Sequence, residues 1–173
     1  MISMWYAIWT KTGSERSLCL WIDKYVPEAL YDACFVPLVE QNKKINGEWR
    51  NISKPLFPGY IFVSASEDGI NDFAEYLKLY KKFAVVLNTD GVFTPINEEE
   101  LYLIEKAFFN NGILGTSIGT LEGDRINIIS GPLKGFEGSI IWINRHKRAA
   151  TIEIKMFGRV SRVNIGLEII SKA

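Results

Sequence analysis

The sequence is poor in the residue types that build disulfide-rich and metal-binding proteins. Its 173 residues contain two cysteines, Cys19 and Cys34, and one histidine, His146. Two isolated cysteines are too few for a disulfide framework or a cysteine-based metal site. We therefore expect two buried free thiols, no metal and no cofactor.

Long apolar segments are also missing. No run approaches the ~18 apolar residues that a membrane-spanning helix needs. The N-terminus lacks the basic stretch, apolar core and cleavage site of a secretory signal. With 47% hydrophobic and 23% charged residues, the composition is typical of a folded globular protein. We expect a cytoplasmic protein without a membrane partner, of a length suited to one medium domain or two small ones.

Catalytic motifs are scarce. His146 lies in a basic turn without an evident acidic or nucleophilic partner. The glycine loop at residues 131–135 lacks the Gly-Lys-Ser/Thr ending of a phosphate-binding loop. The acidic run at residues 98–100 is better explained as a helix start, where the helix dipole favours carboxylates. We expect no catalytic residues, and a binding protein is the better class than an enzyme.

Net charge is unevenly distributed, although it sums to zero over the chain. Residues 1–110 carry a net charge of −4, and residues 111–173 carry +4. The tail is therefore the basic module.

Strand and helix patterns alternate over residues 1–110, which is typical of one compact α/β or α+β domain. Asn46-Gly47 predicts a type I′ turn in an exposed hairpin, because this pair tolerates the positive φ angles that the turn requires. The predicted strands are residues 5–9, 33–37, 60–63 and 85–87, and the predicted helices run from 14 to 25, from 70 to 82 and from 97 to 108.

The sequence pattern changes after a segment rich in Gly, Ser and Thr. We expect a flexible linker at residues 110–119, a first domain at 1–109 and a second at 120–173. Short β-rich pieces in the tail predict a small barrel, a geometry that removes exposed sheet edges. The five predicted strands are 125–129, 138–143, 150–157, 159–165 and 167–171.

Large aromatic rings are denser in the first domain than its core requires. Some of them should form an exposed apolar patch that marks a partner surface, although complete burial is the alternative. The rings are Trp5, Tyr6, Trp9, Trp21, Phe57, Tyr60 and Phe62.

Basic residues gather in the turn at 145–148, with further cations elsewhere in the tail. Clustered cations on a net-positive module are typical of phosphate binding, and a solvated basic face is the alternative. Together these residues form the predicted RNA-binding set: Lys134, Arg145, His146, Lys147, Arg148, Arg159 and Arg162.

Three blocks, in order along the chain, resemble the NusG family of transcription elongation factors. They are Trp5-Tyr6, the Pro-Leu-Phe-Pro-Gly-Tyr-Ile-Phe-Val run at 55–63, and the Gly-Asp-Arg start at 123 that continues through the loop at 131–138 to Phe157-Gly158-Arg159. The last block looks like a KOW motif. The resemblance implies an α+β fold: an N-terminal α/β NGN-type domain, with an antiparallel sheet flanked by helices, linked to a small SH3-like β-barrel.

The resemblance also implies partners. The first domain would bind RNA polymerase at the clamp helices of its largest subunit and suppress pausing, while the tethered barrel recruits another partner. By similarity to the specialised paralogue RfaH, the polymerase contacts would be Trp9, Phe57, Pro58, Tyr60 and Phe62. Residues on the edge that faces non-template DNA would be Lys11, Arg16, Lys81 and Lys82. The His-Thr-Thr bridge of RfaH is not visible in this sequence.

Departures from the family pattern favour a specialised paralogue similar to the LoaP type of antiterminator. Where the general factor has Thr-Pro and an acidic residue, this chain has Ser161-Arg162-Val163-Asn164. We expect a monomeric antitermination factor whose barrel binds RNA, such as a leader hairpin. The alternatives are a general NusG whose barrel binds Rho or a ribosomal protein, and an RNA-binding ribosomal or assembly protein. Glycines and isoleucines in the tail predict a barrel rather than the helical hairpin known from RfaH.

Overall fold

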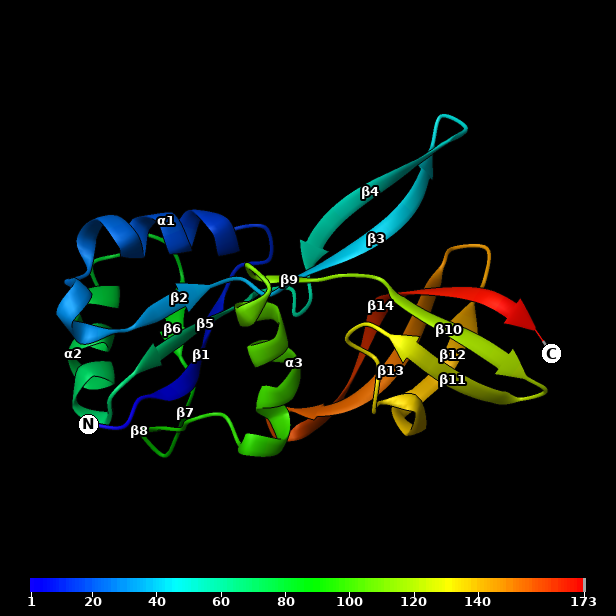
Figure 1. Cartoon of the computed structure of the whole chain (residues 1–173). Coiled ribbons are helices and arrows are strands. Elements are labelled where there is room, and N and C mark those ends of the chain that lie inside the picture. The colour runs from blue at the N-terminus through cyan, green and yellow to red at the C-terminus, as the bar shows by residue number, and fades with distance from the viewer. Residues whose placement is uncertain (173) are drawn as a thin grey trace. The chain divides into compact units, whose positions relative to one another are not determined.

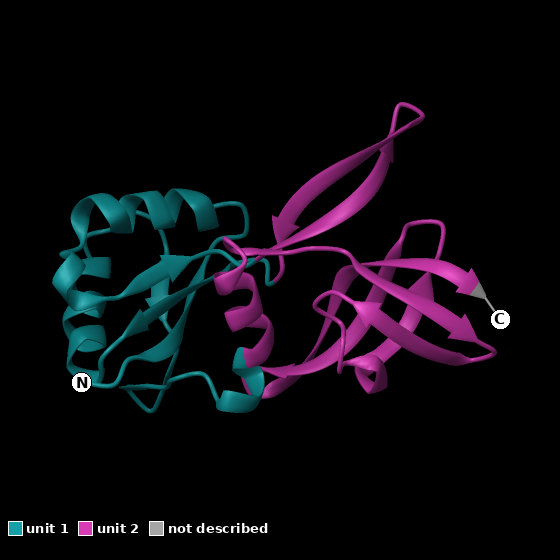
Figure 2. Cartoon of the chain, in the orientation of Figure 1, with its two compact units in different colours: residues 1–37, 57–101 teal, residues 38–56, 102–173 magenta. Residues whose placement is uncertain are grey.

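A computed structural model describes residues 1–172 (Figure 1), and the chain divides into two compact units. Unit 1 holds residues 1–37 and 57–101, and unit 2 holds residues 38–56 and the chain from 102 onward (Figure 2). This division differs from the predicted domain boundaries at residues 109 and 120. The hairpin at 38–56 and most of the third helix are grouped with the tail.

Unit 1 contains a four-stranded antiparallel sheet in the order β2-β5-β1-β6. Helices α1 and α2 share one apolar core with this sheet, to which α1 contributes Leu18 and Ile22 and α2 contributes Ile70 and Phe73. The elements of this unit are β1 (Met4–Thr10), α1 (Glu15–Tyr25), η1 (Glu28–Leu30), β2 (Ala33–Phe35), β5 (Tyr60–Ala65), α2 (Glu67–Leu77), β6 (Ala84–Val86), β7 (Asn88–Thr89) and β8 (Val92–Phe93).

Helix α2 ends earlier than the predicted residue 82. The amides of Lys78, Leu79 and Tyr80 bond to carbonyls three residues back, at 3.2, 3.0 and 3.0 Å. Such bonds tighten the chain into a 3₁₀-type turn, and the α-helix ends at Leu77. Lys81 and Lys82 therefore lie in the loop before β6. Helix α3 (Glu98–Phe109) begins where the acidic run predicted it.

Unit 2 begins with the predicted hairpin, formed by β3 (Leu38–Ile45) and β4 (Glu48–Pro55). Asn46 and Gly47 both have positive φ angles, of 51° and 84°. Two consecutive positive φ angles are what a type I′ turn requires, so the predicted turn is confirmed. Strand β3 also pairs in parallel with β9 (Ile113–Leu114). Part of the segment predicted to be a flexible linker is therefore a paired strand.

The tail folds as strands, which confirms the prediction of a β-barrel module instead of a helical hairpin. Its five-stranded sheet has the order β11-β10-β14-β13-β12. The module's buried side chains include Ile128, Leu133, Ile152, Ile165 and Leu167. Its elements are β10 (Ser117–Glu122), β11 (Arg125–Ser130), η2 (Glu137–Ser139), β12 (Ile140–Asn144), β13 (Ala149–Met156) and β14 (Arg159–Lys172).

Strand β14 corrects the prediction of two strands separated by a turn at Gly166. The strand is continuous for 14 residues. It pairs with β13 up to Gly166 and with β10 from Leu167 onward, so Gly166 marks a change of partner. A Cβ there would lie 2.6 Å from Thr116 Oγ1 and 3.0 Å from the Glu40 carbonyl oxygen. Neighbouring chain segments therefore approach position 166 so closely that only a residue without a side chain fits. The glycine does not mark a turn.

Candidate functional surfaces

Unit 1 carries an exposed aromatic surface centred on Trp9. The Trp9 side chain is 50% exposed and packs edge to face against Phe83, which is 48% exposed, at a ring separation of 5.0 Å. On either side of Trp9 the cross-strand partners are Tyr60 of β5 and Val85 of β6. Direct cross-strand partners point to the same face of a sheet. We call Trp9, Tyr60, Phe83 and Val85 the Trp9 surface.

A buried carboxylate holds the neighbouring loop in place. Glu15, the first residue of α1, is 3% exposed, and its two carboxylate oxygens accept hydrogen bonds from the Gly59 amide at 2.7 Å and the Gly13 amide at 2.8 Å. Gly59 has φ +86°, and its carbonyl accepts the Thr10 amide at 2.8 Å. These bonds fix the loop at 57–59 against the end of β1, beside Trp9. The sequence patterns did not single out Glu15 for this role, since a first-turn acid is common on exposed helices.

The five predicted polymerase contacts do not lie together on the surface. Trp9 and Pro58 are exposed and Tyr60 is partly buried, but Phe57 is 5% exposed and Phe62 is 0% exposed. The two buried rings pack against each other at 5.8 Å. Phe57 and Phe62 thus lie inside the protein, where a ring supports a surface but does not form one. In this conformation Phe62 presents no surface to a partner, and Phe57 presents little.

Of the seven aromatic rings in the predicted patch, Trp9 alone is exposed. Tyr6 is buried and Trp5 and Trp21 are partly buried. Phe83 and Val85 complete the surface and were missed by sequence reasoning. A signal for them was present in the sequence. Successive side chains of a strand point to opposite faces, so residues 83 and 85 of the segment 83–86 are expected on the same face.

The four predicted DNA-facing cations are all exposed. Pairing of Thr10 with Ala84 brings the segment after β1, with Lys11, next to the loop that holds Lys82. The Thr10 hydroxyl donates to the Phe83 carbonyl at 2.8 Å and closes this junction. Lys11 and Lys82 therefore belong to one edge of unit 1, next to Trp9, and Arg16 is the second residue of α1.

The basic turn at 145–148 connects β12 to β13 and is exposed. Asn144 Oδ1 accepts the Lys147 amide at 2.9 Å, and the Arg148 amide donates to the Arg145 carbonyl at 3.3 Å. These bonds fix the backbone, which has a positive φ angle at Arg148. The side chains of Arg145, His146 and Lys147 extend outward.

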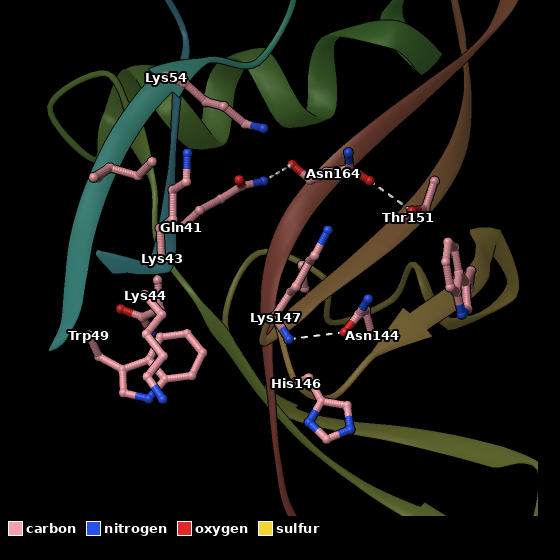
Figure 3. A pocket seen from close by; sticks show the side chains of 14 residues that line it. Gln41, Lys43, Lys44, Trp49, Lys54, Asn144, His146, Lys147, Thr151 and Asn164 are labelled. Atoms are coloured by element: carbon pink, nitrogen blue, oxygen red, sulfur yellow. Dashed lines mark hydrogen bonds between the residues drawn. The ribbon is translucent and has the colours of Figure 1, made fainter. Parts of the chain in front are cut away.

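A groove of about 730 Å³ lies in unit 2 between the β3–β4 hairpin and strands β12, β13 and β14 (Figure 3). Both walls carry cations, and we call this feature the basic groove. Its lining includes Lys43, Lys44, Trp49 and Lys54 from the hairpin, and Trp142, Asn144, His146, Lys147, Thr151 and Asn164 from the barrel.

The contacts between the hairpin and the barrel within unit 2 include a hydrogen bond and a cation–π pair. Gln41 Nε2 donates to the Asn164 carbonyl at 3.3 Å. The Arg148 guanidinium carbon lies 4.8 Å from the centre of the Trp49 ring, within the range of a cation–π interaction. Arg145, His146 and Arg148 also line a second hollow of about 400 Å³, together with Glu168 and Ile169. His146 lines both hollows.

The remaining predicted RNA-binding residues do not join this cluster. Arg159 follows the turn at the far end of β13, so the whole length of that strand separates it from the basic turn. Arg162 pairs with Glu153 at 3.3 Å on the neighbouring strand. Lys134 is exposed in the 131–135 loop, and its carbonyl accepts the Tyr102 hydroxyl at 3.4 Å. None of the three is among the described residues that line the groove.

The two cysteines are free, as predicted, and they lie together in unit 1, partly buried. Their Sγ atoms are 4.0 Å apart. The hydrogen bond with Cys19 and, to a smaller extent, burial raise the pKa of the Cys34 thiol well above its ordinary value. Among residues 1–172, no group of three or more His, Cys, Asp or Glu side chains could hold a metal ion. The helices within this range are too short or too polar to cross a membrane.

The fold is a two-part α+β fold, with an NGN-type α/β domain and a KOW-like β-barrel. The family described as "Transcription termination factor nusG" matches residues 3–110. The chain therefore belongs to the NusG family.

Relatives match over nearly the whole chain. The "Transcription termination/antitermination protein NusG" of Thermus thermophilus is 24% identical over 189 residues, covering 98% of each chain. The protein of the same name from Bacillus subtilis is 27% identical over 184 residues, covering 97% of each. The solved structure "Domain interaction in Thermotoga maritima NusG" aligns with a TM-score of 0.53 at 21% identity, covering 95% of this chain and 93% of that one. The last likeness shows the fold alone.

Proposed function

We propose that this NusG-type transcription termination/antitermination factor is a specialised paralogue that promotes processive antitermination at particular operons. It would act in the cytoplasm, without catalysis, by binding RNA polymerase through residues 1–109 and RNA through residues 120–173. The end of the family match at residue 110 supports the first boundary. The observation that carries the proposal is the presence of two different surfaces, one aromatic and one basic, on the two units.

The Trp9 surface is the proposed site for the clamp helices of the polymerase. Exposed, preordered aromatic rings are the side chains that most often dominate protein interfaces. Replacing Trp9 or Tyr60 by Ala should weaken binding of the full-length protein to polymerase by about 2 kcal/mol, measured by biolayer interferometry. Trp142→Ala, which removes an exposed tryptophan from unit 2, is the matched control. Equal affinities for all folded variants would reject this surface.

The cations at 11, 81 and 82 support a second contact, with non-template DNA. Lys11 follows β1, which holds Trp9, and Lys81 and Lys82 precede β6, which pairs with β1, so a strand passing the bound polymerase could meet them. Changing all three to Gln should lower crosslinking to the non-template strand without lowering polymerase affinity.

The basic turn at 145–148 is the proposed site for a leader RNA hairpin. Four neighbouring basic residues are held on a fixed turn, where they can meet converging phosphates and, for arginine, guanine edges. Changing Arg145, Lys147 and Arg148 together to Ala should flatten the slope of log affinity against log salt by roughly 0.7–0.9 for each phosphate that is no longer neutralised. Lys155→Ala, an exposed cation within β13, is the control. Hairpin affinity that survives the triple change would rule out the turn.

One structural observation favours the general factor as the second candidate. Arg162, whose gain distinguishes this chain from the usual family pattern, is paired with Glu153, so its charge is partly offset on the barrel surface. A barrel that binds no RNA but captures Rho or a ribosomal protein would assign the chain to the general type. A ribosomal or assembly protein is the weaker alternative, since it leaves the family-matched residues 3–110 without a role.

A further inference from the structure

We infer that the basic groove binds unpaired RNA, with nucleobases stacked on Trp49 and Trp142 and phosphates held by the surrounding lysines. The inference rests on the proposed RNA binding by the barrel. It adds a site beyond the basic turn, on residues of the β3–β4 hairpin, and it specifies the structural class of the RNA.

The charge of the groove suits a polyanion. Lys43, Lys44 and Lys54 lie on one wall and Lys147 on the other, and the described residues that line it include no aspartate or glutamate. Figure 3 shows the labelled side chains of both walls extending around one space. Cations that face one another across a groove reinforce their field and attract phosphates from both sides.

Two tryptophans in the groove keep much of their surface exposed. Trp142 is 66% exposed on the edge strand β12, and Trp49 is 44% exposed on β4. Burying an indole ring is strongly favourable, so exposed rings among lysines are typical of stacking platforms for bases. The Arg148 guanidinium already lies over Trp49 at 4.8 Å. A base added to this pair would extend an existing stack.

Polar groups on the barrel side of the groove can contact a base or a ribose hydroxyl. The Oδ1 atom of Asn144 accepts the Lys147 amide at 2.9 Å, and that of Asn164 accepts the Thr151 hydroxyl at 2.7 Å (Figure 3). Each asparagine side chain also carries an NH₂ group that can donate hydrogen bonds. Such donors match the acceptor atoms of nucleobases and the 2′-hydroxyl of RNA.

The dimensions and the chemistry favour unpaired RNA over a duplex. In a duplex the bases are already stacked and paired, so their faces are closed to a tryptophan side chain, and the major groove of A-form RNA is too narrow for side chains to read. Unpaired bases can turn outward and enter a hollow of about 730 Å³, a volume within the range of small-molecule sites. The basic turn can hold a hairpin stem while the groove takes an adjacent single-stranded segment.

The test uses the full-length protein and a fluorescein-labelled 12-nucleotide RNA without self-complementarity, followed by fluorescence anisotropy. We expect this strand to bind at least tenfold more tightly than a blunt duplex of the same length. Trp142→Ala and Trp49→Ala should each weaken single-strand binding roughly 5- to 150-fold, as for the loss of one stacked base. Trp142→Phe should recover most of the affinity, and Leu20→Ala, which removes an exposed apolar side chain from unit 1, should leave it unchanged.

Two parallel experiments test the role of the groove lysines and the preference for RNA over DNA. Lys54→Gln should flatten the dependence of log affinity on log salt by about 0.7, whereas Lys155→Gln outside the groove should not. Single-stranded DNA of the same sequence should bind more weakly, and equal affinity would overturn the assignment to RNA. A leader hairpin that binds through the basic turn, with no binding of the 12-mer, would overturn the groove and leave the proposed function intact. Failure to bind any RNA would overturn both.

Discussion

Glu15→Gln tests whether the buried carboxylate orders the loop beside Trp9. In the folded protein the two carboxylate oxygens of Glu15 accept the amides of Gly13 and Gly59, at 2.8 and 2.7 Å, in a site where the side chain is 3% exposed. Glutamine keeps the size of the side chain but replaces one acceptor oxygen by an N–H donor. One backbone amide would then face another donor and remain unsatisfied.

The expected loss follows from the bonds involved. A hydrogen bond to a charged group contributes about 1.5–3 kcal/mol, and a buried amide left unsatisfied costs about 1–3 kcal/mol. Loss of a negative charge at the first residue of α1 removes a further 0.3–1 kcal/mol, roughly, of interaction with the helix dipole. These effects overlap, so we expect Glu15→Gln to lower the free energy of unfolding by about 2–4 kcal/mol.

Urea unfolding followed by tryptophan fluorescence measures this change. Glu67→Gln is the matched control, because Glu67 is also the first residue of a helix but its side chain is exposed. It should cost only the dipole contribution, about 0.3–1 kcal/mol. Hydrogen exchange at the Gly59 amide should also accelerate in Glu15→Gln and not in Glu67→Gln. If the two variants unfold at the same urea concentration, the argument from the buried carboxylate is wrong.

Three further predictions concern other parts of the chain. Phe62→Ala should lower the free energy of unfolding by about 3–5 kcal/mol in a urea titration, because the ring is fully buried; a variant as stable as the parent would contradict its place in the interior. Gly166→Ala should cost about 1–3 kcal/mol through crowding against Thr116, whereas Gly138→Ala, with no atom within 4 Å of the added Cβ, should cost less than half as much. The Cys34 thiol, with its raised pKa, should resist iodoacetamide at pH 8.5 until the protein unfolds. An unfolded thiol ionises near pH 8.5 and the folded Cys34 thiol only at higher pH. The contribution of Cys34 to the free energy of unfolding is therefore complete below about pH 8.5 and falls as pH rises further. Rapid alkylation of Cys34 in the folded protein at pH 8.5 would contradict the raised pKa.

Local patterns were sufficient to predict most of the secondary structure. The Asn46-Gly47 pair predicted a type I′ hairpin, since few other dipeptides tolerate two positive φ angles, and both residues have them. The acidic run at 98–100 located the start of α3, and apolar spacing located α1 and α2. Isoleucine-rich pieces between glycines predicted strands in the tail. In each case the signal lies within a few residues, where backbone sterics and side-chain periodicity act directly.

The errors lie where a residue serves a distant neighbour. Gly166 has the sequence character of a turn, but the barrel uses it to let β14 pass close to Thr116 and Glu40. The segment at 110–119 has a linker composition, but β3 supplies a pairing partner for residues 113 and 114. Composition could not show either contact, because the partners lie in other elements, far away along the chain.

The sequence by itself determined the family, the hairpin, the helices, the β character of the tail and its basic turn, because motifs and periodicity carry this information locally. Tertiary structure decided which of the predicted site residues lie together. Burial removed Phe57 and Phe62 from the surface and strand pairing added Phe83 and Val85 to Trp9. In unit 2, β13 separated Arg159 from the basic turn, and the fold placed the hairpin lysines opposite that turn. The chemistry of a charged or aromatic side chain is known from the sequence, but its neighbours and its exposure depend on long-range packing.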